Sequence, residues 1–272
     1  QNPCADPMKL ASYTVKEVLY AVDETVVARA EGDGGERVVL KYQDTRHPSP
    51  ELNARWRHEH SILESLDSRW VIRTLGLVQD GNSLVLVLED FGSANLAQVA
   101  ARRGLDLAER MALALQLCSA ISAVHERDLI HCDISSKNVL VDLATLNLKL
   151  CDFALSTRLA HDQKPGPESG LRGTLEYMSP EQTGRTSLEI DYRSDLYSLG
   201  IVLYELFCGR TPFQSRDPMT LLHAQIAISP TPLHMVDPTI PEPLSLVVQK
   251  LLAKSPDDRY QSSFGLHCDL AE

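Results

Sequence analysis

The first third of the chain alternates apolar and polar positions, which is the pattern of β-strands with one buried face. It predicts strands over residues 13–19, 25–30 and 37–42. The sequence DGG at 33–35 marks a hairpin turn between the last two of these strands. Two more strands are expected over 71–78 and 83–88, separated by the turn sequence DGN.

One helix interrupts these strands, and helices dominate after residue 92. Ser49 followed by Pro50 is typical of a helix start, and this helix is expected to run to about residue 66. Asp106 and Glu109 form a capping-box pattern before the apolar-periodic stretch 111–124. The run 196–208 is apolar almost all round and is followed by a glycine, which predicts a buried central helix. Five prolines between 230 and 243 predict a loop before the last helices. A β-rich part followed by a helical part indicates the α+β class.

Bulk composition narrows the possible partners. The 272 residues carry a formal net charge of −11, which argues against nucleic acid or an anionic membrane as the main partner. No apolar run is expected to span a bilayer. The six cysteines show no C-x-x-C spacing, which favours reduced thiols and a cytoplasmic location. Because the chain begins with Gln1, it is expected to be a piece of a longer protein.

Two short segments carry the most specific chemistry. The sequence HCDISSKN at 131–138 resembles the catalytic loop H-R-D-x-x-x-x-N of the eukaryotic-type protein kinases, and DFA at 152–154 resembles their D-F-G. The resemblance implies that Asp133 is the catalytic carboxylate and that Lys137 reaches the γ-phosphate of ATP. It also implies that Asn138 and Asp152 hold Mg²⁺.

A lysine and a glutamate earlier in the chain extend the resemblance. VVLK at 38–41 resembles the V-A-I-K strand, and Glu59 falls where the family has a helical glutamate that pairs with this lysine. The resemblance implies that Lys41 and Glu59 serve ATP binding, and that Glu89 and Phe91 offer backbone groups to adenine. Taken from the residues alone, Lys41 could equally be a surface charge on an amphipathic strand, and Glu59 an exposed helical acid.

A third segment, GTLEYMSPE at 173–181, resembles the G-T-x-x-Y-M-A-P-E segment that receives the acceptor residue. Its Thr174 is typical of the serine/threonine branch of the family. The resemblance also implies that Glu181 pairs with Arg259 and that Asp195 braces the catalytic loop.

Together these segments imply a two-lobed protein-kinase fold over 13–272. The expected lobes are a small β-rich N-lobe at 13–88 and a larger helical C-lobe at 93–272, joined by a hinge at 89–92. The sequences EDFG (89–92), EQTGR (181–185) and LLAKS (251–255) resemble one subgroup more narrowly. This subgroup is the N-terminal kinase-like domain of large microbial proteins that continue into an ATPase module, GAF domains and a sensor histidine kinase. It implies a signalling role, with a protein substrate and the downstream ATPase and sensor-kinase domains as partners.

Three departures from the family pattern leave two functions open. Tyr20, Val22 and Thr25 take the places of the three glycines of the phosphate-binding loop. Ala154 replaces the glycine of D-F-G, and Cys132 replaces the arginine that pairs with a phosphorylated activation loop. The chain is therefore expected to be either a Mg-ATP-dependent serine/threonine kinase or a pseudokinase with a binding or structural role. With Cys132, activity is not expected to depend on a phosphate in the segment 155–172.

Overall fold

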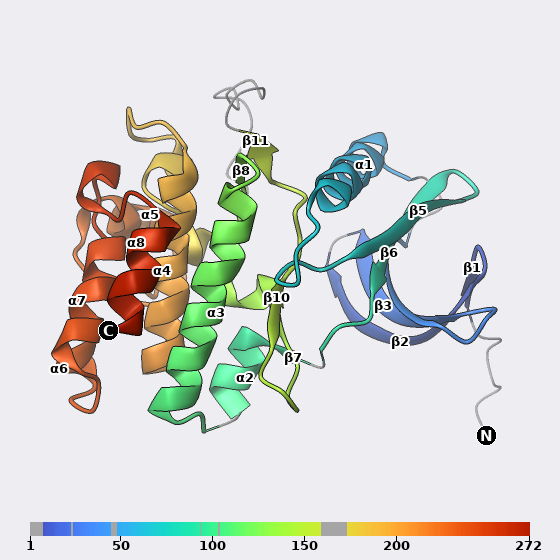
Figure 1. The fold of residues 1–272 in the computed structure, drawn as a ribbon. Coiled ribbons are helices and arrows are strands. Elements are labelled where there is room, and N and C mark those ends of the chain that lie inside the picture. The colour runs from blue at the N-terminus through green and yellow to red at the C-terminus, as the bar shows by residue number, and fades with distance from the viewer. Residues whose placement is uncertain (1–7, 23, 45–47, 93, 103, 159–172) are drawn as a thin grey trace. The chain divides into compact units, whose positions relative to one another are not determined.

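The computed structural model describes residues 8–22, 24–44, 48–92, 94–102, 104–158 and 173–272. The contacts divide the chain into two units, Gln1–Phe91 and Gly92–Glu272. The first unit is β-rich and the second is mainly helical, which confirms the predicted α+β class (Figure 1).

In its described part, the first unit is a six-stranded antiparallel sheet with one long helix, α1 (Pro50–Ser65). The strands stand in the order β1-β2-β3-β4-β6-β5. Their bounds are β1 Lys9–Leu10, β2 Tyr13–Val22, β3 Thr25–Gly32, β4 Arg37–Gln43, β5 Thr74–Asp80 and β6 Ser83–Glu89. The sequence placed the start of β5 too early, because Val71 and Ile72 are buried apolar residues that precede the strand.

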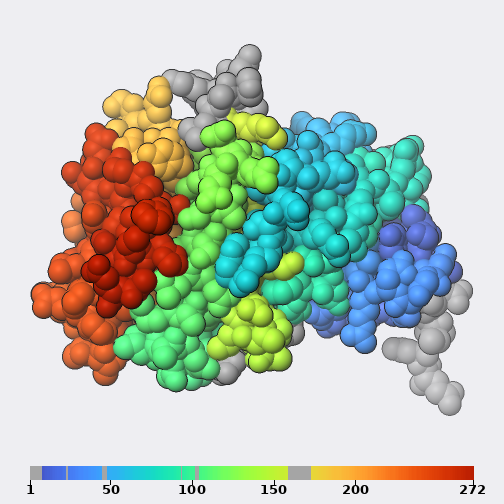
Figure 2. Space-filling view, viewed as in Figure 1, coloured from blue at the N-terminus to red at the C-terminus, as the bar shows by residue number. Residues whose placement is uncertain are grey.

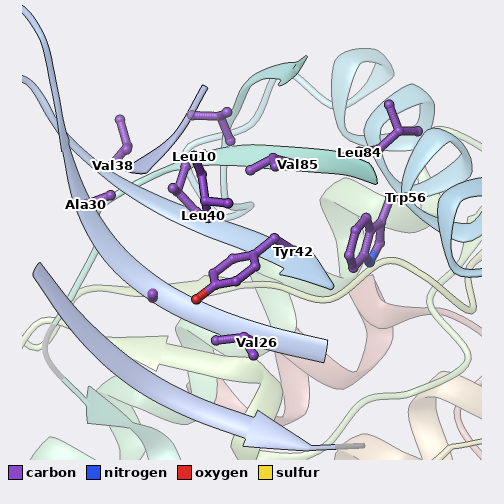
Figure 3. Close-up of a cluster of buried hydrophobic side chains, with 11 residues drawn as sticks. Leu10, Val26, Ala30, Val38, Leu40, Tyr42, Trp56, Leu84 and Val85 are labelled. Atoms are coloured by element: carbon purple, nitrogen blue, oxygen red, sulfur yellow. The ribbon is translucent and has the colours of Figure 1, made fainter. Parts of the chain in front are cut away.

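Because side chains alternate along each strand, the two faces of this sheet carry different residues. Leu40 on β4 stands opposite Ala28 on β3, and both belong to a buried apolar cluster that also holds Trp56 of α1 (Figure 3). Because neighbouring residues of a strand point to opposite faces, Lys41 lies on the other side of the sheet. There it stands beside its ladder partner Val27 on β3. The β4 register therefore decides which face carries the lysine.

Local capping explains where the helices begin. Ser49 caps α1 by accepting the N–H of Leu52 at 3.4 Å. The predicted capping box is confirmed at α3 (Leu107–His125), where Asp106 Oδ1 accepts the N–H of Glu109 at 2.8 Å and Glu109 Oε2 accepts the N–H of Asp106 at 3.1 Å. Each bond satisfies a backbone donor that the helix itself leaves free.

The central helix α4 (Tyr192–Cys208) begins four residues before its predicted start, because Asp191 caps it by accepting the N–H of Arg193 at 2.7 Å. Its Gly200 is required by packing. A Cβ at this position would lie 2.8 Å from the Cβ of Leu251 on α7 (Glu242–Leu251), so the glycine lets the two helices approach closely.

The remaining elements of the second unit complete its helical core and its short strands. The helices are α2 Leu96–Arg102, α5 Pro218–Ala227, α6 Leu233–Val236 and α8 Ser263–Ala271, with single 3₁₀ turns η1 Ser136–Asn138, η2 Leu175–Tyr177, η3 Glu181–Thr183 and η4 Pro256–Asp258. The strands are β7 Ala94–Asn95, β8 Leu129–Ile130, β9 Val139–Val141, β10 Leu148–Leu150 and β11 Thr157–Arg158. The predicted proline-rich loop is wrong in part. It contains the short helix α6, and Pro243 lies in the first turn of α7, where its missing N–H costs no hydrogen bond.

Helix α3 bears on the expectation that no apolar run of this sequence spans a bilayer. Among the described residues it is the helix that is long and apolar enough to cross a membrane by length and composition. The core helix of a folded domain passes the same test. Leu113, Leu117 and Ile121 are fully buried on α3, and Figure 2 shows the red atoms of α8 directly beside this green helix.

Candidate active site

In the first unit, Lys41 and Glu59 form a buried ion pair. The Nζ of Lys41 lies 2.8 Å from Oε2 of Glu59, and their side chains are 9% and 1% exposed. Strand β4 supplies the lysine and helix α1 the glutamate. This confirms the predicted pairing and excludes both simpler interpretations, a surface lysine and an exposed helical acid. The contact gives each of two buried groups a partner of opposite charge, which offsets part of the cost of burying them.

The two residues predicted to meet adenine lie at the end of the same unit. Glu89 is the last residue of β6, where its N–H donates to the carbonyl of Arg73 at 3.0 Å and its Oε1 accepts the N–H of Arg73 at 2.8 Å. Phe91 is the last residue of the unit. These bonds fix the backbone at residue 89, while the adenine contacts themselves stay a prediction.

In the second unit, Asp133 and Asn138 lie together in the catalytic loop. The Nδ2 of Asn138 donates to Oδ2 of Asp133 at 3.1 Å and to its main-chain carbonyl at 2.9 Å. The other carboxylate oxygen, Oδ1, accepts the N–H of Thr174 at 2.9 Å. Gly173 lies so close that a Cβ there would be 3.2 Å from Oδ1, and its φ is +101°. The predicted catalytic carboxylate is therefore held in one orientation from both sides.

Asp195 braces this loop, as the resemblance implied. Its Oδ2 accepts the N–H of His131 at 2.8 Å, and its Oδ1 accepts the N–H of Cys132 at 2.9 Å. The ring of His125 lies 2.9 Å from Oδ2. Cys132 has a φ of 66°, in the left-handed region that non-glycine residues rarely adopt. Two backbone bonds to a buried carboxylate stabilise this strained turn directly before Asp133.

Gln182 is a positioning residue that the sequence did not reveal. Its Nε2 donates to the carbonyl of Cys132 at 2.7 Å, and its Oε1 accepts from both the N–H and the hydroxyl of Ser179 at 3.0 Å. It thereby ties the end of the 173–181 segment to the residue before Asp133. The sequence signal was limited to its place in the subgroup motif EQTGR.

Cys132 does not behave as a reactive thiol. Burial raises its pKa well above the ordinary thiol value, and the negative charges of Asp195 and Asp133 raise it further. The neutral thiol is a poor nucleophile and a poor metal ligand. The pKa therefore favours a packing role for Cys132 over a chemical one.

Asp152 and Asn138 have the chemistry that a magnesium ion requires. The N–H of Cys151 donates to the carbonyl of Asn138 at 2.9 Å, which joins the two segments, and Asp152 has a left-handed φ of 64°. A side-chain amide binds a cation through its oxygen, so Oδ1 of Asn138 can hold Mg²⁺ while its Nδ2 donates to Asp133. No group of three or more His, Cys, Asp or Glu suited to a metal occurs in the described residues. Mg²⁺ typically takes one or two protein oxygen ligands together with substrate phosphates, so the donor set fits.

Lys137 and Ser135 differ in their surroundings. Lys137 lies in η1 and is exposed, and its predicted contact with the γ-phosphate stays a prediction. Ser135 lies two residues after Asp133 in the same loop. It is 1% exposed, and its hydroxyl has no hydrogen-bond partner in the described part of the chain. The cation thus stands on the solvent side of the loop and the small hydroxyl on the inner side.

A second buried ion pair holds the segment 173–181. Arg259 donates to Oε1 of Glu181 at 2.7 Å and to Oε2 at 3.0 Å, and both side chains are 0% exposed. This confirms the expected pairing. In the same segment, Tyr177 donates to Oε2 of Glu205 at 2.6 Å and lies 2.7 Å from the hydroxyl of Ser136 in the catalytic loop.

The hairpin that has other residues at the three glycine positions still forms a paired β2–β3 ladder. Strands β2 and β3 stay paired as far as Val22 and Thr25, with register shifts between Val15 and Glu17 and between Val18 and Tyr20. Tyr20 is 49% exposed and Val22 is 60% exposed. Replacing the glycines has therefore left the strand pairing intact.

Comparison with known proteins agrees with this geometry. Residues 24–268 match the family model described as "Protein kinase domain". The chain belongs to the protein kinase family. The expected kinase fold is therefore confirmed.

Several curated relatives of this kinase domain are serine/threonine kinases. It is 35% identical over 153 residues to serine/threonine-protein kinase PknB of Mycobacterium leprae, which covers 56% of this chain and 24% of that protein. It is 29% identical over 221 residues to serine/threonine-protein kinase PrkC of Bacillus subtilis, covering 81% of this chain and 34% of that protein. It is also 52% identical over 97 residues to hybrid signal transduction histidine kinase G of Dictyostelium discoideum, covering 36% of this chain and 3% of that protein. The chain thus spans about a third or less of the length of each of these relatives.

Proposed function

We propose that this domain is a Mg-ATP-dependent serine/threonine kinase that transfers the γ-phosphate of ATP to a protein hydroxyl. The observation that carries the proposal is the arrangement of Asp133, whose carboxylate is held by Asn138 and by the N–H of Thr174. Phosphoryl transfer depends mainly on positioning and on charge stabilisation, so a fixed carboxylate beside a metal-binding amide is the feature that it needs.

Each predicted residue has a role in this proposal. Asp133 orients the attacking hydroxyl of the acceptor and takes its proton. Lys41, held by Glu59, contacts the α- and β-phosphates, and Lys137 contacts the γ-phosphate. Asn138 and Asp152 hold Mg²⁺, which when bound neutralises charge on the phosphates. Glu89 and Phe91 bind adenine through their backbone groups.

The proposal also places the domain in a larger signalling protein in the cytoplasm. The partial match to a hybrid signal transduction histidine kinase supports an attached sensor-kinase domain as a partner. The ATPase domain rests on the subgroup resemblance of the sequence alone. The free thiols Cys118, Cys132, Cys151, Cys208 and Cys268 support a reducing compartment.

A pseudokinase is the second candidate, and the β2–β3 hairpin is the observation that favours it. Exposed Tyr20 and Val22 replace glycines that bring the backbone close to phosphates. Such a module would bind a nucleotide, or no ligand, and would regulate its attached domains without transferring phosphate.

Phosphate transfer from γ-labelled Mg-ATP to dephosphorylated casein, or to the domain itself, separates the two candidates. Asp133→Asn is run beside Asp128→Asn, which removes the same charge from an exposed turn. A kinase transfers label in the wild type and in Asp128→Asn but not in Asp133→Asn, and the labelled residues are serine or threonine. A folded wild type that is saturated with ATP and transfers nothing contradicts the kinase proposal. ATP binding measured with and without Mg²⁺ then distinguishes a nucleotide-binding pseudokinase from a structural one.

A further inference from the structure

The acceptor turn η2 is held from a distance by a buried chain of polar groups. The chain begins at Lys254, whose Nζ donates to the hydroxyl of Tyr197 at 3.0 Å. Tyr197 donates to Oε1 of Gln225 at 2.8 Å. Nε2 of Gln225 then donates to the carbonyl of Glu176 at 2.8 Å and, more weakly, to that of Leu175 at 3.4 Å. Tyr197 and Gln225 are both 0% exposed.

The donor and acceptor roles in this series of hydrogen bonds are fixed at both ends. The ammonium group of Lys254 can only donate, so the hydroxyl of Tyr197 accepts from it and passes its own hydrogen to Gln225. The carbonyls of Leu175 and Glu176 can only accept, so the amide nitrogen of Gln225 must face them. Gln225 therefore has one orientation in which every partner is satisfied.

The two carbonyls belong to a turn that cannot satisfy them itself. In η2 the carbonyl of Leu175 accepts only a long 3.4 Å bond from the N–H of Met178. Gln225, on α5, supplies the missing donor to Glu176 as well. A single 3₁₀ turn is a weak structure by itself, so an external donor at its end decides its shape.

At the end of the hydrogen-bond series away from η2, Lys254 and its neighbour Arg259 are held by several contacts. Lys254 lies over the ring of Phe213 at 4.6 Å and also donates to the carbonyl of Ala224 at 3.2 Å. Arg259 lies over the ring of Tyr197 at 4.8 Å. All five N–H groups of Arg259 are used by carbonyls or by Glu181, which leaves this guanidinium no freedom to move.

We propose that Gln225, oriented by Tyr197 and Lys254, is a positioning residue that sets the shape of the acceptor turn and thereby the affinity for the protein substrate. The inference rests on the proposed kinase function. Gln225 contacts the main chain of the turn and none of the catalytic residues, so it acts on acceptor binding and leaves ATP binding unchanged.

Helix α4 offers a matched pair of variants for the test. Tyr197→Phe removes the hydroxyl that orients Gln225. Tyr204→Phe removes another buried hydroxyl from the same helix, one that donates to the carbonyl of Thr231 at 3.0 Å. Tyr197→Phe loses the hydrogen bonds to Lys254 and Gln225, and Tyr204→Phe loses the one to Thr231, but only the first variant alters the polar network that ends at η2.

Two readouts are measured: the KM values for casein and for ATP, and the hydrogen exchange of the amides at 174–178. We expect Tyr197→Phe to raise the casein KM by about three- to tenfold, the effect of one weakened hydrogen bond, with an unchanged KM for ATP. We expect faster exchange at 174–178 in this variant and neither change in Tyr204→Phe. Gln225→Met should raise the casein KM and the exchange rates as much as Tyr197→Phe does. The double variant should show no larger changes than either single variant, because all three interrupt the same hydrogen-bond network.

Equal casein KM values and equal exchange rates in the two tyrosine variants would overturn the inference. So would additive effects in the double variant. If the wild type transfers no phosphate, the kinase proposal fails, and the exchange rates at 174–178 alone decide whether Gln225 shapes the turn.

Discussion

Arg259 donates two hydrogen bonds, of 2.7 and 3.0 Å, to the carboxylate of Glu181, and both side chains are 0% exposed. The hydroxyl of Ser194 also donates to Oε1 of Glu181 at 2.7 Å. The pair joins the end of the acceptor segment to the last part of the chain, 78 residues away. Breaking such a buried pair leaves one charge without a partner, which costs more than losing an exposed pair.

Arg259→Met should lower the free energy of unfolding by about 3–5 kcal/mol, because Glu181 is left buried and uncompensated. Chemical denaturation measures this change. The control is Asp257→Asn, which removes an 86% exposed partner of Arg193 and should cost about 0–1 kcal/mol. A loss of less than about 1 kcal/mol in Arg259→Met would contradict the assignment of the pair as a buried anchor.

Lys41 and Glu59 should be strongly coupled in a double-mutant cycle. Each single variant, Lys41→Met or Glu59→Leu, leaves a buried charge alone and should destabilise the domain by about 3–5 kcal/mol. The double variant should lose clearly less than the sum, because it buries neither charge. Denaturation of the four proteins gives the coupling energy directly. A coupling near zero would mean that the 2.8 Å contact adds nothing to stability.

The sequence predicted those features that depend on local spacing. The capping box at Asp106 and the helix start at Ser49 are local rules, and the structure confirms both. Lys41 and Glu59 were found through a family motif, although the residues alone left a surface location open. Their burial settles that alternative, because burial depends on the packing of α1 on the sheet.

Features that depend on contacts between residues far apart in the chain could not be predicted from the sequence. Val71 and Ile72 have strand-like side chains but fill the core ahead of β5. Gln225 lies in an apolar helix and reaches a carbonyl 49 residues earlier, which no spacing rule indicates. The left-handed backbone of Cys132 is likewise imposed by Asp195, 63 residues away.

Activity should not require phosphorylation of the segment 155–172, most of which lies outside the described residues. Cys132 stands where a guanidinium normally binds that phosphate, and its raised pKa keeps it neutral. Transfer to casein before and after phosphatase treatment should differ by less than about tenfold, which corresponds to about 1.4 kcal/mol on the barrier. A larger fall after treatment would show that another cation binds the phosphate.

Lys254 should make a contribution to the stability of the domain that rises with pH between about 8 and 10.5. Burial, together with the positive charge of Arg259, lowers its pKa from 10.5 to about 8. Between these two values the unfolded chain binds a proton that the folded chain has released, so raising the pH favours the folded state. Below about pH 8 both states are protonated, and the cost of burying the charge is constant.

Lys254→Met isolates this effect, because other groups also titrate in the alkaline range. The difference in unfolding free energy between the wild type and Lys254→Met should shift in favour of the wild type from about pH 8 to 10.5, measured by denaturant titration at several pH values. Its size is reduced because Lys254 is only partly buried, and solvent screens the exposed part of the charge. A difference that stays constant with pH would mean that Lys254 keeps an ordinary pKa. The ammonium of Lys254 would then be well solvated despite its contacts with Tyr197 and Phe213.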